Sequence, residues 1–168
     1  MRNERYQDPD FFGLLFAGAP FSDIGADPTG ATPGQPTARF ADITDGLSNT
    51  LLAAEVIQGQ GADQRGFTWS GQCSGITAFL GPNSLSPDVL TFANECVYPF
   101  TTNPPCTYEN APGAGPSVLL ASRSRHPGGV YVVLGDGSSR FIKNSINLAM
   151  WRALSTTRGG EIISADAF

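Results

Sequence analysis

The sequence has little charge of either sign, and no surplus of positive charge. Only 15% of the 168 residues are Asp, Glu, Lys or Arg, and the formal net charge is −5. Proteins that bind nucleic acid through its phosphates carry clustered Lys and Arg, so we expect no nucleic-acid partner. With 40% hydrophobic residues the chain can still bury a core, and we expect one domain over residues 1–168.

Histidine and metal-binding patterns are also scarce. His126 is the only histidine, and the three cysteines show no Cys-x-x-Cys spacing, which excludes a structural zinc site within one protomer. We expect no cofactor, with a structural calcium ion as the alternative. The weak calcium candidates are Asp42, Asp45 and Glu55, together with the N-terminal acids Asp8, Asp10, Asp23 and Asp27.

Long apolar runs are missing as well. No stretch approaches the roughly 20 apolar residues that cross a bilayer, and the run from Phe11 to Phe21 is broken by two glycines and a proline. The charged first residues do not lead into a signal-peptide core, because Asp8-Pro9-Asp10 intervenes. We therefore expect a chain without its own export segment, which is either cytosolic or has had that segment removed.

Glycine and proline, in contrast, are abundant, with 20 and 13 copies. Their combined share exceeds the average of about 12%, which argues against a helical bundle. Residues 1–38 are predicted to be irregular. Residues 81–117 contain seven prolines and no apolar period, and we interpret them as a long surface excursion.

The cysteines suggest one disulfide. Cys96 and Cys106 flank a short Pro-rich segment and are the candidate pair, which would leave Cys73 unpaired. Closing this loop would contribute roughly 2 to 3 kcal/mol by chain entropy. Three reduced thiols in a cytosolic protein are the alternative.

Periodicity predicts a few short elements. Thr50–Ile57 is mostly apolar and of strand length, and Gly66–Ser70 is a second strand candidate with Phe67 and Trp69 on one face. These two aromatic residues and Phe79 could line a glycan-binding face, although strand aromatics are more often core.

The clearest local pattern comes late in the chain. Val130–Gly135 and Ser138–Lys143 flank Asp136-Gly137 and predict a hairpin with a type I′ turn. Residues 144–147 offer helix caps, and a helix follows that ends before Gly159. We expect its buried face, Leu148, Trp151 and Leu154, to dock on Val132 and Phe141, and a short strand to follow at Glu161–Ser164. The predicted fold is α+β, built on an antiparallel sheet with one or two short helices and long loops.

One pentapeptide could carry catalysis. Gly71-Gln-Cys73-Ser-Gly75 has the form of a nucleophile elbow, with Cys73 as nucleophile, His126 as base and Asp136 or Asp88 as the orienting acid. However, no long helix follows it, as an elbow requires. His126 and Asp136 would also lie about 17 to 20 Å apart along one strand. A small hydrolase is therefore the alternative, and we expect His126 to be structural.

Several segments, in one consistent order, resemble the DUF1559 family. The signature His-x9-Asp-Gly is present as His126 followed by Asp136-Gly137. The resemblance further marks Asp45, Gly46, Asn49 and Glu55 as family positions. It is carried by Arg39–Glu55, Pro82–Asp88, Ser124–Gly129, Asp136–Ile142, Asn147–Leu154 and Gly159–Ile163.

The resemblance implies a setting more than an activity. Members of this family, abundant in Planctomycetes and relatives, carry a prepilin-type export segment, and the present residues resemble the C-terminal portion. This implies a pilin- or pseudopilin-like domain on the cell surface or outside the cell, with no established activity. It implies self-assembly or pilin-like subunits as partners, and contact with a membrane only through the N-terminal helix of the family.

Overall fold

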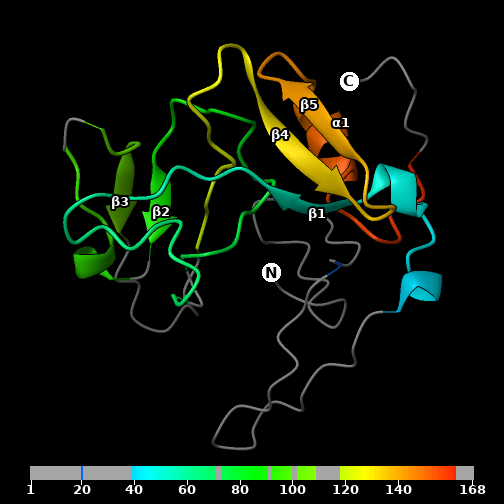
Figure 1. Cartoon of the computed structure of the whole chain (residues 1–168), viewed down its shortest axis with the longest axis horizontal. Helices are drawn as coiled ribbons and strands as arrows, with labels where there is room; N and C mark the ends of the chain where they lie inside the picture. Colours follow the sequence, from blue (N-terminus) through cyan, green and yellow to red (C-terminus); the bar gives the residue numbers. More distant parts are fainter. Residues whose placement is uncertain are drawn as a thin grey trace, which may run out of the picture.

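The computed structural model describes Pro20 and residues 39–70, 73–90, 92–99, 102–108 and 118–161. Within them, β1, β4 and β5 form an antiparallel sheet in the order β1-β4-β5, and β2 and β3 form a parallel pair (Figure 1). The predicted α+β class with an antiparallel sheet is confirmed. The strands are β1 (Leu51–Ala54), β2 (Asp88–Leu90), β3 (Cys106–Tyr108), β4 (Gly129–Leu134) and β5 (Ser139–Lys143), and the helices are η1 (Phe40–Asp42), η2 (Leu47–Asn49), η3 (Ala93–Glu95) and α1 (Leu148–Ala153).

The β4–β5 hairpin is confirmed, but its turn differs from the predicted one. The N–H of Gly137 donates to the carbonyl of Leu134 at 2.9 Å. A type I′ turn needs positive φ at both central residues, whereas here Gly137 alone, with φ of +82°, is left-handed in the turn. The connection therefore matches a type I turn followed by a left-handed glycine.

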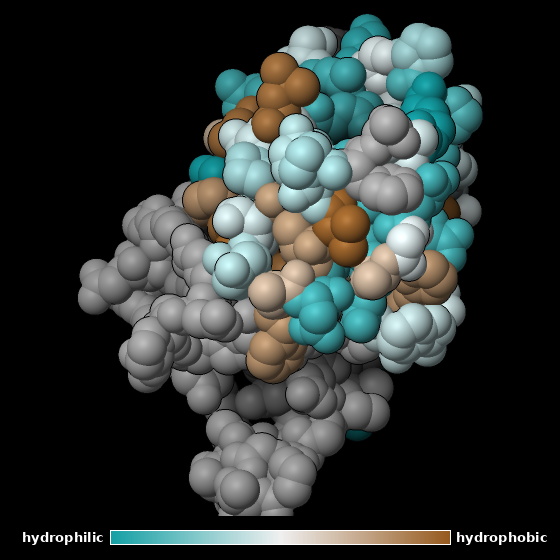
Figure 2. Space-filling model, turned by 90° about the vertical axis from the view of Figure 1, so that its left-hand side faces the viewer, coloured by the Kyte–Doolittle hydropathy of each residue, from teal (hydrophilic) through white to brown (hydrophobic). Residues whose placement is uncertain are grey.

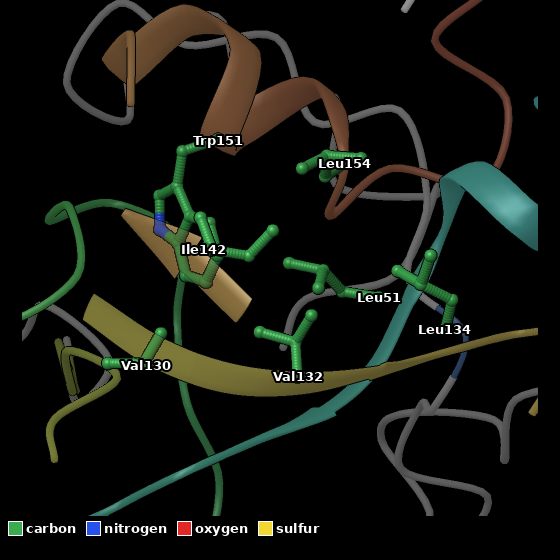
Figure 3. Close-up of a cluster of buried hydrophobic side chains, with 7 residues drawn as sticks. All are labelled: Leu51, Val130, Val132, Leu134, Ile142, Trp151 and Leu154. Atoms are coloured by element: carbon green, nitrogen blue, oxygen red, sulfur yellow. The ribbon is translucent and has the colours of Figure 1, made fainter. Parts of the chain in front are cut away.

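The main core lies between the three-stranded sheet and α1 (Figure 3). Side chains alternate along β4, so Val130, Val132 and Leu134 face the core while Tyr131 and Val133 face solvent. The core cluster consists of Leu51, Val130, Val132, Leu134, Ile142, Trp151 and Leu154.

Helix α1 docks mainly through one aromatic side chain. Trp151 is fully buried and its indole N–H donates to the carbonyl of Leu80 at 3.0 Å. The predicted helix is confirmed, and Asn147 caps it by accepting from the N–H groups of Ala149 and Met150. The expected partners were wrong in two places. Leu148 is 41% exposed because it opens the helix beside Gly81.

The second wrong partner is Phe141, which faces away from the core. Neighbouring residues on a strand point to opposite faces, and Ile142 takes the core position. The ring of Phe141 instead covers Gly129 on β4, where a Cβ would lie 2.8 Å from it. Only glycine fits at this crossing.

The expected surface excursion at residues 81–117 is partly wrong. β2 and β3 lie within it, and the disulfide between Cys96 and Cys106 predicted from their spacing is present. Leu90 and Cys106 are buried with Cys73 and Leu120 in a second core. Residues 109–117 lie outside the described residues.

A buried ion network holds this second region. Asp88 accepts from Arg65 at 2.8 Å, from Arg123 at 2.9 Å and from the backbone N–H of Ala121 at 3.0 Å. Arg65 also donates to Asp63 at 2.7 Å. All four charged side chains are at most 6% exposed. Paired and hydrogen-bonded charges of this kind can be buried at acceptable cost.

Two further strand predictions were made, at Gly66–Ser70 and at Glu161–Ser164. Gly66–Ser70 is not a strand, because its backbone bonds are local: Phe67 donates to Gln64 and Ser70 donates to Phe67. The strand predicted at Glu161–Ser164 lies outside the described residues beyond Glu161, as do residues 1–38 apart from Pro20. No helix in the described ranges is long and apolar enough to cross a membrane.

Trp151→Ala should lower the free energy of unfolding by about 3 to 5 kcal/mol, because it empties the centre of the core and removes the hydrogen bond to Leu80. Leu148→Ala, on the same helix but largely exposed, should cost about 1 kcal/mol or less. Urea denaturation measures both. Equal losses for the two variants would contradict the docking of α1 through Trp151.

Asp88→Asn should destabilise the protein by about 3 to 5 kcal/mol, because it leaves two buried guanidinium groups without their shared carboxylate. The matched control is Asp42→Asn, whose carboxylate is 41% exposed and lies 3.9 Å from Arg158. Its expected cost is below about 1 kcal/mol. Denaturation midpoints that move by similar amounts would show that the Asp88 network contributes no more than a surface pair.

Candidate functional site

Glu55 extends the sheet beyond the end of β1. Its N–H donates to the carbonyl of Tyr131 at 3.1 Å, and its Oε2 accepts the N–H of Tyr131 at 2.8 Å. The side chain therefore satisfies a β4 amide that β1 is too short to reach. This explains why a carboxylate stands at the end of an otherwise apolar strand.

His126 lies against the same carboxylate. Its Nε2 is 3.1 Å from Oε1 of Glu55, and its ring meets Tyr131 edge-on, with centroids 5.4 Å apart. The His126 side chain is 51% exposed, so the contact is a surface pair. We call Glu55, His126 and Tyr131 the Glu55 corner.

The loop before β4 completes the Glu55 corner. The carbonyl of Glu55 accepts from the N–H of Arg123 at 2.9 Å and from the hydroxyl of Ser122 at 2.8 Å. Asn83 accepts the N–H of Ser124 at 2.7 Å and donates to the carbonyl of Gly129 at 3.1 Å. Sequence reasoning missed Asn83, although the residue lies inside a segment that carries the family resemblance.

Asp136 is not the partner of His126. Its Oδ1 accepts the N–H of Ser138 at 2.8 Å, which fixes the hairpin turn at the other end of β4. The signature His and Asp therefore stand at opposite ends of one strand: His126 contacts the Glu55 carboxylate, and Asp136 holds backbone. Gly137 supplies the left-handed residue that closes the turn.

The second family segment also holds backbone. Asp45 accepts the N–H groups of Gly159 and Gly160, both at 2.8 Å, and the hydroxyl of Thr156 at 3.0 Å. Gly46 has φ of +93°, and Asn49 donates to the carbonyl of Asp45 at 3.3 Å. These contacts attach the chain after α1 to the segment that leads into β1.

The calcium candidates do not converge. Asp42 accepts the N–H of Arg39, Asp45 binds the loop after α1, and Glu55 binds β4 and His126. In the described part of the chain no three His, Cys, Asp or Glu residues are grouped so that they could hold a metal ion. The N-terminal candidates Asp8, Asp10, Asp23 and Asp27 lie outside that part.

Cys73 is placed for packing. It is 1% exposed and shares a core with Leu90, Cys106 and Leu120. Burial raises the pKa of its thiol above the ordinary value, which disfavours the reactive thiolate. The cavity beside it, lined by Arg65, Asp88 and Arg123 among others, has a volume of about 10 Å³, close to that of one water.

The hypothetical triad is not assembled. Cys73 makes no hydrogen bond to His126 among the described contacts, and Asp88 is occupied by Arg65 and Arg123. The described contacts of His126 are Glu55, Tyr131 and Ser124. No nucleophilic thiol is among them.

The aromatic residues considered for a glycan-binding face have different contacts. Phe67 and Trp69 lie 5.6 Å apart between ring centroids, and Trp69 is 70% exposed. Phe79 instead lies 5.1 Å below the guanidinium of Arg152.

Glu55→Ala should lower the free energy of unfolding by about 1 to 2 kcal/mol, because the N–H of Tyr131 loses its acceptor. His126→Gln should cost less than about 1 kcal/mol, since it removes an exposed pair with Glu55 and one edge-on ring contact with Tyr131. Thermal unfolding of both variants and the double variant measures the difference. A larger loss for His126→Gln would show that the histidine, not the carboxylate, holds this corner.

Comparison with known proteins gives one finding. No curated protein and no solved structure matches the chain. A family model described as a protein of unknown function, DUF1559, matches residues 5–149, beginning well before the segments that carried the resemblance. That span covers most of the chain, together with the Glu55 corner, β4 and β5. The chain therefore belongs to the DUF1559 family.

Proposed function

We propose that this chain is a structural or binding module of a cell-surface or secretion assembly, related to type IV pilins and pseudopilins. The observation that carries the proposal is the use of the family positions. Glu55, Asp136 and Asp45 each accept backbone N–H groups, and none of them lines the cavity beside Cys73. Family positions that fix the backbone favour a structural role, in which a stable fold presents its surface to a partner.

The disulfide supports an exported setting. Cys96 and Cys106 are linked, and disulfides persist mainly in oxidising compartments outside the cytosol. Cys106 is the first residue of β3, and β3 and its partner β2 are each only three residues long, so the covalent link stabilises a strand with few ladder bonds of its own. We therefore propose an extracellular or cell-surface location, with pilin-like subunits as partners.

Recognition through a surface is the mode of action that fits. Over the face on the side of β2 and β3, apolar side chains stand in small groups among hydrophilic ones (Figure 2). Elsewhere on the described surface as well as on this face, several large side chains are about half exposed, as at protein-binding surfaces. They include Phe92, Tyr98, Tyr108 and Tyr131.

A binding module and a hydrolase differ in their response to alkylation. We expect Cys73 to resist iodoacetamide in the native protein and to react in urea, because burial raises its thiol pKa. Cys73→Ala and His126→Gln should leave generic ester hydrolysis at the blank rate. A reproducible activity that both substitutions abolish would overturn the proposal in favour of a thiol hydrolase.

The compartment has its own readout. Peptide mapping of protein recovered from its native cells, with thiols blocked at lysis, should yield Cys96 joined to Cys106 and Cys73 as a free thiol. Recovery of all three as separately blocked thiols would contradict the exported setting.

A further inference from the structure

The outer edge of β5 offers unpaired backbone groups. The hairpin bonds join Leu134 to Ser138 and Gly128 to Asn144, so the even-numbered residues of β5 bond to β4. The N–H and C=O groups of the odd-numbered residues therefore point away from β4. Among the described residues, those of Ser139 and Phe141 and the N–H of Lys143 have no partner, while the carbonyl of Lys143 accepts from Ile146.

The solvent face beside this edge is aromatic. His126 meets Tyr131 edge-on, and Tyr131 meets Phe141 with centroids 5.1 Å apart and planes at 64°. The row of rings thus runs from the Glu55 corner to the open edge. Phe141 stands between Tyr131 and the open edge, so an apolar side chain on a strand added next to β5 would contact Phe141 and extend this row.

The charge of the strand selects the partner. β5 carries Arg140 and Lys143 and no acidic residue, although the whole chain has a net charge of −5. Lys143 is exposed and shares the solvent face with Phe141. β5 of a second copy would offer Lys143 no carboxylate from the strand, which disfavours self-association through this edge.

We propose that β5 receives an extended acidic segment of a partner polypeptide, which adds as a fourth strand next to Ser139–Lys143. Main-chain bonds to Ser139 and Phe141 hold the segment, an apolar side chain covers Phe141, and a carboxylate pairs with Lys143. This inference rests on the proposed binding function and names the chemistry of its partner.

The test uses the full chain and a defined probe, the blocked peptide acetyl-Thr-Glu-Thr-Val-Thr-Glu-Thr-amide. Its alternation places Val and both Glu residues on one face. NMR amide shifts and hydrogen exchange should show protection confined to Ser139, Phe141 and Lys143, and fluorescence anisotropy of the labelled peptide measures its affinity. A peptide with N-methylated Val and one with Lys in place of both Glu are the matched controls, and neither should bind.

Protein variants separate backbone from charge. Ser139→Pro removes an outward N–H without breaking a bond to β4 and should abolish binding, whereas Ser139→Ala should keep it. Lys143→Glu should weaken binding about tenfold, and Lys143→Gln about threefold, as cross-strand charge pairs do. Unchanged melting temperatures establish that the variants fold.

Three outcomes would overturn the inference. They are no protection of the β5 amides at millimolar peptide, equal binding of the Lys peptide, and concentration-dependent self-association that Ser139→Pro abolishes. The last would assign the edge to a second copy. None of these outcomes supports the hydrolase alternative. That alternative would need a hydrolytic activity that Cys73→Ala and His126→Gln abolish, so the two proposals are tested separately.

Discussion

The region between β1 and β4 depends on the buried ion pairs that Asp88 makes with Arg65 and Arg123. In the described part of residues 56–123 the strands are β2 and β3, each of three residues, and their few ladder bonds do not fix the course of the surrounding loops. Arg65 and Arg123 reach Asp88 from opposite sides along the chain. Arg65 then donates to the carbonyls of Pro104 and Pro105. The buried carboxylate of Asp88 thus connects loops that share no sheet. Removing one partner would leave a buried charge unpaired, and the cost of its desolvation would then lower the stability of the fold.

The same network is joined to the Glu55 corner through Arg123. The side chain of Arg123 donates to Asp88, while its backbone N–H donates to the carbonyl of Glu55. The buried ion pairs therefore position the loop that carries His126. Asp63, on the other side, accepts the N–H of Val97 and so holds the segment next to Cys96.

The family signature has a geometric meaning. The nine residues between His126 and Asp136 comprise the turn before β4, the strand itself and Gly135. His126 marks where the strand begins beside Glu55, and Asp136 fixes the turn where it ends. The spacing measures one strand, and the two polar residues need not touch.

The sequence alone determined the features that depend on residues close together in the chain or on which residue types are present. The hairpin, the capped helix and the Cys96–Cys106 pair all come from short-range patterns, because turn chemistry and period act between near neighbours. Tertiary structure decided everything that joins distant segments. Only it shows that Asp88 pairs with two arginines, that Glu55 rather than Asp136 meets His126, and that Phe141 covers Gly129. No periodicity encodes these contacts, since each charged or aromatic side chain has many permitted partners until the packing of the strands selects one.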